Sequence, residues 1–210
     1  MRVVAISDTH GRHEWVTPPA GDLLVHAGDF TNYGTVEEVE AFLAWFVAQP
    51  HPAKVLIAGN HDFLFEQLPV ESRWVLPPGV TYLQDEAVMV NGLKVWGSPW
   101  VHGGDGWAFT RPRGPALAEK WTLIPSDTDL LITHMPPYQM LDEVPGTYDR
   151  AGGPIGCQDL AEVVNRIRPR LHVFGHVHSG HGSLERSGTI FVNAASTLNQ
   201  KVRVPVVVDI

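Results

Sequence analysis

Eight side chains in this 210-residue sequence have the chemical types that bind divalent cations or move protons, and they follow short apolar runs. They are Asp8, His10, Asp29, Asn60, His61, His134, His176 and His178. Carboxylate, imidazole and amide donors without a thiolate suit Mn, Fe, Zn, Ni or Co better than a soft-sulfur site or an all-oxygen calcium site. The set predicts a metal centre for hydrolytic chemistry; the donor types alone leave both phosphoester and amide hydrolysis open.

The spacing of these residues is also informative. Asp8 and His10, and likewise His176 and His178, are separated by one residue. Alternate side chains of an extended segment lie on the same side, so each pair is predicted to face one point. Glycine stands directly before three candidates, at Gly28, Gly59 and Gly175. Glycine allows a sharp turn off a strand and the close approach of an ion.

Two of the candidates point to a centre with two cations. Asp29 has two carboxylate oxygens and could bridge a pair of cations. Asn60 offers a neutral amide oxygen, which would leave net positive charge at the centre for an anionic substrate.

The elements that must position these residues are short runs rich in Val, Ile and Leu. They cover residues 3–6, 23–25, 55–58, 130–132 and 171–174. Unbroken apolar runs of this length predict strands that are buried on both faces. In open α/β sheets, ligands bind beyond the carboxyl ends of the strands, so the five loops are expected to converge on one crevice.

Helices are predicted between these strands, at residues 35–49, 115–121 and 159–168. The first has a capping box, Thr35 with Glu38, and an apolar stripe that ends before Pro50. Further strands are predicted at residues 81–83, 87–96, 189–193 and 204–209, with a hairpin turn at Asn91-Gly92. We therefore expect an α/β protein, an α/β/β/α sandwich of two mixed sheets flanked by helices, in a single domain over residues 1–210.

Composition narrows the function classes. Lys and Arg number 15 against 23 Asp and Glu, a net charge of −8, which argues against stable nucleic-acid binding and against a nuclease. A small phosphate-bearing substrate remains compatible, since cations can supply local positive charge. The single Cys157 excludes an internal disulfide. No basic and apolar leader and no long apolar run is present, so we expect a cytoplasmic protein without a membrane anchor; the oligomeric state stays open.

In this order, the motifs resemble the five signature blocks of the calcineurin-like metallophosphoesterase superfamily. The blocks are Asp8-x-His10, Gly28-Asp29, Gly59-Asn60-His61-Asp62, His134 and Gly175-His176-x-His178. Longer segments are most similar to the metallophosphoesterase-domain-containing group, at residues 6–10, 26–30, 57–61, 97–100, 119–125, 132–137 and 169–176. Some animal members of that group have Gly at the position of His176 and Glu at that of Asp62.

The resemblance implies two divalent cations, with Mn or Fe expected first and Zn, Ni or Co as alternatives. It places the first cation on Asp8, His10, Asp29 and His178, and the second on Asn60, His134, His176 and the shared Asp29. His61 would not be a ligand; it would assist the leaving group while cation-activated hydroxide attacks phosphorus. The alternative for His61 is phosphate binding without proton transfer.

The implied activity is that of a dinuclear metal-dependent phosphodiesterase acting on cyclic nucleotides or aryl phosphodiesters. A phosphomonoesterase or pyrophosphohydrolase, and a metal-binding scaffold of low activity, are the alternatives.

Other residues are expected to have structural roles. His26 and His172 are predicted to lie in the core, His51 in a surface loop, Asp62 in a turn or beside the ligands, and Cys157 as a buried thiol. Two roles are left open for a second set, contact with substrate or loop structure. This set consists of Trp100, Trp107, Phe109, Arg113 and Arg150.

Overall fold

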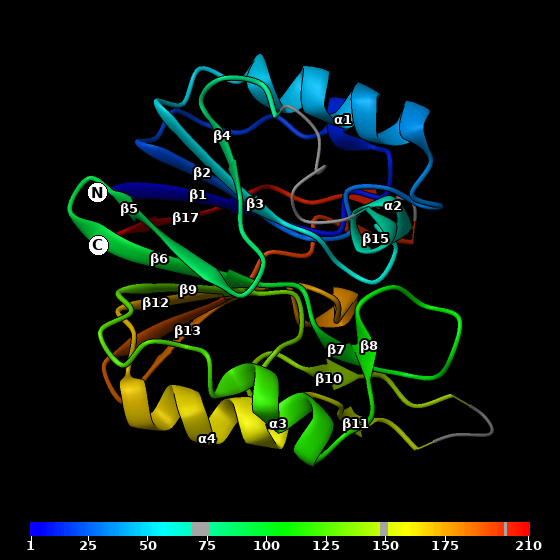
Figure 1. The fold of residues 1–210 in the computed structure, drawn as a ribbon, viewed down its shortest axis with the longest axis vertical. Helices are drawn as coiled ribbons and strands as arrows, with labels where there is room; N and C mark the ends of the chain where they lie inside the picture. Colours follow the sequence, from blue (N-terminus) through cyan, green and yellow to red (C-terminus); the bar gives the residue numbers. More distant parts are fainter. Residues whose placement is uncertain (69–75, 148–150, 200) are drawn as a thin grey trace.

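The computed structural model describes residues 1–68, 76–147, 151–199 and 201–210 and arranges them in four layers. Two β-sheets pack face to face. Helix α1 (Val36–Val47) covers the outer face of one sheet, and helices α3 (Pro115–Trp121) and α4 (Gln158–Ile167) cover the other (Figure 1). The predicted α/β/β/α sandwich is confirmed. Arg150 lies outside the described residues.

The first sheet has the strand order β17-β1-β2-β3-β4. Its strands are β1 (Arg2–Ile6), β2 (Leu23–Ala27), β3 (Ala53–Ile57), β4 (Val80–Tyr82) and β17 (Val206–Asp209). Strands β1 to β4 are parallel, and β17 pairs antiparallel with β1 at the edge. The carboxyl ends of β1, β2 and β3 therefore meet at one edge of the sheet.

The second sheet has the order β13-β14-β12-β9-β6-β5. Its strands are β5 (Glu86–Val90), β6 (Leu93–Ser98), β9 (Leu130–Thr133), β12 (Leu171–Phe174), β13 (Gly182–Arg186) and β14 (Thr189–Asn193). The central strands are parallel, and antiparallel hairpins close both sides. The hairpin predicted at Asn91-Gly92 is confirmed, with φ of 50° and 82°. Strand β13 was not predicted.

Helix α1 begins as the sequence predicts. Thr35 Oγ1 accepts a hydrogen bond from Glu38 N (3.3 Å), and the Glu38 carboxylate accepts one from Thr35 N (3.2 Å). The same carboxylate accepts bonds from the backbone of Asn32 and Tyr33, so the cap also fixes the loop before the helix.

The remaining elements of the described residues are short. They are α2 (Phe63–Gln67), the 3₁₀ helices η1 (His13–Trp15) and η3 (His178–Gly180), and the two-residue strands β7 (Val101–His102), β8 (Thr110–Arg111), β10 (Glu143–Val144), β11 (Gly153–Pro154), β15 (Thr197–Leu198) and β16 (Lys201–Val202).

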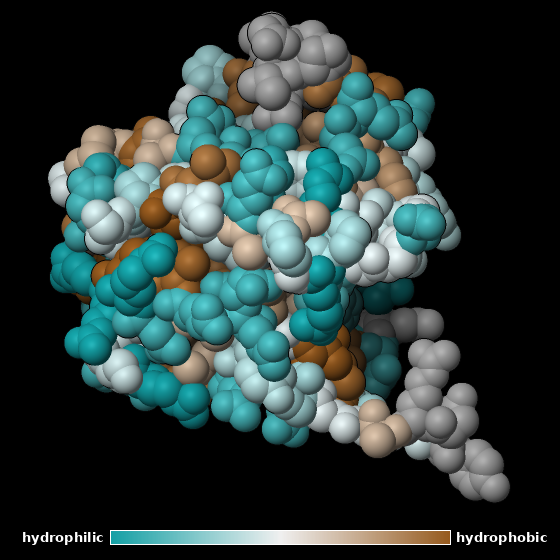
Figure 2. All heavy atoms as spheres, turned by 60° about the horizontal axis from the view of Figure 1, so that its bottom comes forward, coloured by the Kyte–Doolittle hydropathy of each residue, from teal (hydrophilic) through white to brown (hydrophobic). Residues whose placement is uncertain are grey.

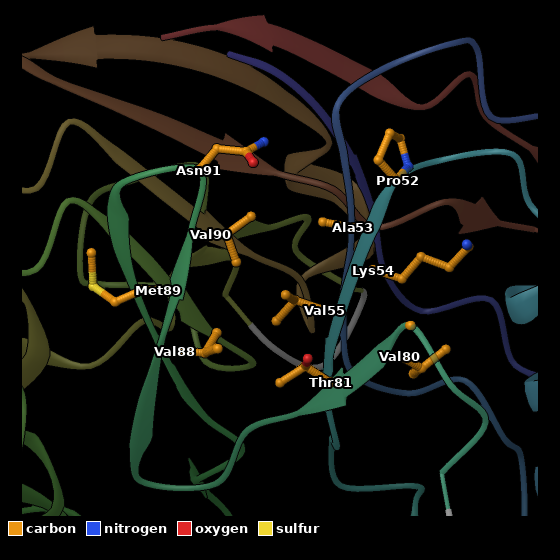
Figure 3. A pocket seen from close by; sticks show the side chains of 11 residues that line it. Pro52, Ala53, Lys54, Val55, Val80, Thr81, Val88, Met89, Val90 and Asn91 are labelled. Carbon is orange, nitrogen blue, oxygen red and sulfur yellow. The ribbon is translucent and has the colours of Figure 1, made fainter.

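The space between the two sheets is filled by aliphatic side chains from both. Val3, Val25 and Val55 of the first sheet are buried there, and Ile132 and Val173 come from the second. At the amino ends of the parallel strands, a cavity of ≈ 320 Å³ lies between β3, β4 and the β5–β6 hairpin and is lined mainly by apolar residues (Figure 3). None of the eight candidate residues lines it.

Seen from the side of α3 and α4, the surface is mostly hydrophilic, with small separate apolar patches (Figure 2). Among the described residues, every helix is too short or too polar to cross a lipid bilayer.

One prediction about the fold's histidines is wrong. His51 lies in a loop, as its flanking prolines suggest, but it is only 2% exposed, and its Nε2 lies 2.9 Å from the carbonyl oxygen of Pro19. The flanking Pro50 and Pro52 are exposed, so only the His51 side chain is buried, and its Nε2 finds a backbone partner there.

Candidate metal centre

The eight candidates come together where β1, β2 and β3 of the first sheet and β9 and β12 of the second reach their carboxyl ends. This edge lies beside α2 and β15, at the opposite end of the molecule from the two termini (Figure 1). The centre thus contains residues from both sheets and lies at the carboxyl ends of their parallel strands, where ligands of α/β proteins are expected to bind.

The first group of donors contains Asp8, His10 and His178. His178 Nε2 lies 3.3 Å from Asp8 Oδ1, and His10 Nε2 lies 3.2 Å from His178 Nε2. Two imidazole nitrogens this close cannot both carry a proton, whereas a shared cation would satisfy both. The backbone N–H of His176 donates to Asp8 at 3.0 Å and fixes that carboxylate.

The second group contains Asp29, His134 and His176, with Asn60 between them. His134 Nε2 lies 3.2 Å from both Asp29 Oδ2 and Asn60 Oδ1, and His176 Nδ1 lies 2.9 Å from Asn60 Oδ1. The Nδ1 atom of His134 lies 2.8 Å from the carbonyl oxygen of Ala27, which leaves Nε2 for the centre.

The predicted pairing of neighbours holds for one pair and fails for the other. Asp8 and His10 belong to the same group, whereas His176 and His178 belong to different groups. The expected extended backbone is also wrong, because φ is 53° at Asp8, 45° at His10 and 66° at His176. These left-handed conformations turn each side chain away from the strand direction, at a cost in backbone strain that is common at functional sites.

The Asp62 carboxylate connects the loops that follow β2 and β3 through hydrogen bonds. Its Oδ2 accepts hydrogen bonds from Asp29 N (2.9 Å) and Gly59 N (2.8 Å), and its Oδ1 accepts bonds from Thr31 N (3.0 Å) and Thr31 Oγ1 (2.7 Å). Burial and the charge of Asp29 raise the pKa of this carboxyl group, and the hydrogen bonds oppose that shift. Of the two predicted positions for Asp62, in a turn or beside the ligands, the structure shows the second.

Replacing Asp62 by Ala is expected to lower the free energy of unfolding of the metal-free protein by about 3 kcal/mol or more, because several buried N–H groups lose their acceptor. Denaturant titration measures this. Asp129→Ala is the matched control, since the Asp129 carboxylate accepts a hydrogen bond from Lys94 N at 2.8 Å and holds no loop of the centre. Equal destabilisation by both variants would contradict the role of Asp62.

His61 forms a third possible donor group with His10 and Asp29, which connects the first two groups, and it is oriented by the loop before α1. Its Nδ1 lies 2.8 Å from the carbonyl oxygen of Asn32, an acceptor only, so Nδ1 carries a proton and Nε2 is directed elsewhere. The His61 ring makes a T-shaped contact with the ring of His10, with centroids 4.6 Å apart, and a tilted contact with Trp107 at the same distance. Trp107 is 46% exposed, and the neighbouring Ala108 N donates to Asn60 O at 3.1 Å.

Charge shifts the pKa values of the donors within each group. Burial opposes protonation of His134, but the charge of Asp29 and their hydrogen bond raise the pKa of His134 to about 9. Burial and the charge of His134 lower the pKa of His176 to about 4. Burial alone would raise the pKa of Asp8, but the hydrogen bond and charge of His178 hold it far below its usual range. Without a bound cation, the charge of Asp29 thus favours the protonated form of His134.

Cation binding is therefore expected to release protons and to tighten as pH rises. The pKa of His134 is raised from 6.5 to about 9, so the metal-free protein keeps this proton through neutral pH and loses it near pH 9. Calorimetric titration with Mn²⁺ at pH 7 and 8, in buffers of different ionisation enthalpy, counts the protons. We expect up to about tenfold tighter binding per pH unit for each proton released. Binding that is independent of pH would contradict this arrangement.

Two other histidines that are predicted to be structural, His26 and His172, contact threonines next to the candidate ligands. His26 Nε2 lies 3.1 Å from Thr9 Oγ1, and His172 Nε2 lies 2.9 Å from Thr133 Oγ1. Burial lowers the pKa of each to about 3, so both are neutral. Each threonine is adjacent to a candidate ligand, and these two core predictions are confirmed.

Four of the residues whose role was left open, Trp100, Trp107, Phe109 and Arg113, lie in the loops between β6 and α3. Trp100 and Phe109 are buried, and Arg113 donates to the carbonyl oxygens of Ile155 and Gly156, so these three serve loop structure. Trp107 alone among them contacts a candidate, His61. The prediction that Cys157 is a buried thiol is confirmed, and Trp121 Nε1 donates a hydrogen bond to its Sγ at 3.3 Å.

A cavity of ≈ 420 Å³ opens beside the centre. Its lining consists of His10, Arg12, Asn32, His61, His178, Thr197, Leu198 and Asn199. Sequence reasoning did not single out Arg12, Asn32 or Thr197. Arg12 and Asn32 follow His10 and Asp29 by two and three residues but form no pattern of their own, whereas Thr197 lies outside all the motifs.

Comparison with known families identifies the class of protein. The family model described as Calcineurin-like phosphoesterase matches residues 1–180. The chain belongs to this family and is a metal-dependent phosphoester hydrolase, as the motifs and donor groups indicate.

Individual relatives refine the comparison. Metallophosphoesterase domain-containing protein 1 of Homo sapiens is 42% identical, with 100% of this chain and 71% of the relative covered. A UPF0046 protein of Caenorhabditis elegans is 41% identical, with 93% and 69% covered. The crystal structure of TT1561 of Thermus thermophilus shares the fold, with a TM-score of 0.62, 16% identity, and 92% and 88% of the two chains covered.

Proposed function

We propose that the protein is a dinuclear phosphodiesterase whose substrates are cyclic nucleotides or aryl phosphodiesters. The observation that carries the dinuclear centre is the position of one oxygen. Asp29 Oδ2 lies 3.2 Å from His134 Nε2 and 4.0 Å from His10 Nε2, so it faces both groups of donors. Asp29 Oδ1 accepts a hydrogen bond from His61 N at 2.8 Å, so the carboxylate is held in place and Oδ2 would be available to the cations.

The residues fit two divalent cations. Asp8, His10 and His178 would hold the first, and Asn60, His134 and His176 the second, with Asp29 shared. Imidazole, carboxylate and amide donors suit borderline cations, and we propose Mn or Fe, with Zn, Ni or Co as alternatives. When bound, such cations supply Lewis-acid charge for the phosphoryl group and activate water for attack.

The chain's own residues then orient the substrate and supply a proton. With Nδ1–H directed to the Asn32 carbonyl, His61 can give a proton only from Nε2, in its imidazolium form. Donation to the leaving oxygen would contribute about 10²–10⁴-fold to the rate. Asp62 and Thr31 hold the loops that carry Asp29 and His61 in place.

The cavity supports a small diester as substrate. Its volume of ≈ 420 Å³ lies in the range of small-molecule sites and gives room for groups on both sides of a phosphate. The net charge of −8 does not favour a polynucleotide.

Turnover of bis(4-nitrophenyl) phosphate and of 4-nitrophenyl phosphate by the purified protein tests the proposal. The protein is stripped of metal and reloaded with Mn, Fe, Zn, Ni or Co. We expect metal-dependent hydrolysis with kcat/KM at least about tenfold higher for the diester. The cyclic nucleotides 3′,5′-cAMP and 2′,3′-cAMP are then compared by product analysis.

Two other outcomes would replace the proposal. Faster hydrolysis of the monoester, or of a pyrophosphate, would indicate a phosphomonoesterase or pyrophosphohydrolase. Binding of two cations without turnover of any substrate in the panel would favour a metal-binding scaffold.

A further inference from the structure

Arg12 lies on the wall of the cavity beside the candidate metal centre, two residues after His10. A tight turn brings it there. Gly11 has a φ of 71°, Arg12 N donates to Thr9 O at 2.8 Å, and Arg12 O accepts from Trp15 N at 3.0 Å. The backbone of Arg12 is thus fixed by the same loop that carries His10.

The charge of Arg12 has no partner within the described part of the chain. There, its guanidinium takes part in no ion pair and no side-chain hydrogen bond. It makes a cation–π contact with the ring of Trp15, whose centroid lies 5.6 Å from the guanidinium carbon. Arg113 and Arg203, by contrast, donate to carbonyl oxygens, and Arg203 supports the backbone of His178. The Arg12 guanidinium is therefore available to a ligand.

The surroundings of Arg12 select for an anion. The described residues that line the cavity include no carboxylate, although the whole chain contains 23 Asp and Glu. Among these lining residues Arg12 is the one with a permanent positive charge. A guanidinium presents paired N–H groups that match phosphate and carboxylate oxygens.

Arg12 is also separate from the donor groups. Among the described residues it belongs to neither group of candidate ligands, and its side chain pairs with neither Asp8 nor Asp29. We propose that Arg12 binds a second anionic group of the substrate, a phosphate or a carboxylate, beyond the phosphoester that is cleaved. This inference rests on the proposed function insofar as the cavity is the substrate site.

Binding of stable phosphonates tests this directly. Phenylphosphonate, benzene-1,3-diphosphonate and 3-carboxyphenylphosphonate are titrated calorimetrically into the Mn²⁺-loaded protein and its Arg12→Gln, Arg12→Lys and Arg166→Gln variants. We expect the second anionic group to tighten binding at least about tenfold in the unaltered protein. Arg12→Gln should abolish that gain, Arg12→Lys should retain part of it, and the control at Arg166, exposed on α4, should retain all of it.

The pattern of affinities decides the outcome. A gain with the diphosphonate alone would identify a second phosphate, and a gain with the carboxylate as well would identify a general anion site. The proposal is overturned if the second anion brings no gain, if no phosphonate binds, or if Arg12→Gln weakens phenylphosphonate as much as the diphosphonate. The last result would place Arg12 on the scissile phosphoester.

Turnover separates this inference from the proposed function. Phenyl 4-nitrophenyl phosphate is compared with its analogue that carries a 3-phosphonate on the phenyl ring, so the leaving group is the same. An Arg12-dependent gain in binding without turnover of either ester would refute the phosphodiesterase and leave the anion site standing. Turnover of both esters with equal KM would refute the anion site alone.

Discussion

Asp29→Asn is expected to lower kcat/KM by at least about a thousandfold, about 4 kcal/mol, and to reduce bound metal from two ions per chain to one or none. Asp29 Oδ2 faces His134 at 3.2 Å and His10 at 4.0 Å, so the substitution removes the negative charge shared by both groups of donors. The amide oxygen of Asn can still accept the bond from His61 N, so the fold should persist. Steady-state kinetics and metal analysis after gel filtration measure the two effects.

The matched control for this variant is Asp22→Asn. Asp22 lies at the amino end of β2, far from the centre, and its Oδ2 accepts a hydrogen bond from Arg2 N at 2.6 Å. It should keep full activity and both ions. If Asp29→Asn retained two ions per chain and near-normal turnover, the shared-ligand assignment would be wrong.

His61→Gln is expected to reduce kcat by about 10²–10⁴-fold while both ions stay bound. The loss should depend on the leaving group, because a general acid matters most when the departing oxygen is basic. A diester that expels an alkoxide should therefore lose more activity than one that expels 4-nitrophenolate. Rates are compared for dimethyl phosphate, which expels methoxide, and for methyl 4-nitrophenyl phosphate, which expels 4-nitrophenolate.

His102→Gln serves as the control for the change from imidazole to amide. His102 lies outside the centre, with Nε2 2.7 Å from the carbonyl oxygen of Ile155. Equal losses for both leaving groups in His61→Gln would make His61 a phosphate-binding residue instead of an acid. Loss of a metal ion would make it a ligand.

Local patterns in the sequence predicted most of the fold. The apolar runs at residues 3–6, 55–58 and 171–174 correspond to buried parallel strands because every residue of such a strand faces a packed layer. The capping box at Thr35 and Glu38 depends on contacts within four residues and is present in the structure. Interactions of this range can be deduced without knowing the tertiary fold.

The features that were missed depend on distant contacts. Strand β13 has one aliphatic side chain in its five residues, Leu184, and it exists because it pairs with β14. The turn between them, Ser187-Gly188 with φ of 54° and 82°, is the one local signal that could have indicated the hairpin. The burial of His51 likewise depends on Pro19, 32 residues away.

In the candidate site, too, local patterns predicted some features, while others depend on distant contacts. Strand ends and motif order predict that the eight residues gather, since parallel strands share one carboxyl edge. The distribution of His176 and His178 over two groups agrees with the resemblance to the family, but the spacing alone predicted the opposite, because it took no account of the left-handed backbone at His176. Two features depend on how loops from different strands pack: the Arg12 guanidinium, which is unpaired among the described residues, and the contact of His61 with Trp107.

The division of the donors between the sheets has a consequence for the order of events during folding. Both carboxylates, Asp8 and Asp29, come from the first sheet, whereas the second sheet contributes only the imidazoles of His134, His176 and His178. His10, Asp29 and His61 of the first sheet form a donor group by themselves, but each cation of the proposed centre would take at least one ligand from each sheet, so its full set of ligands forms only after the sheets have docked. Cations then act as cross-links that slow unfolding and leave the rate of folding unchanged.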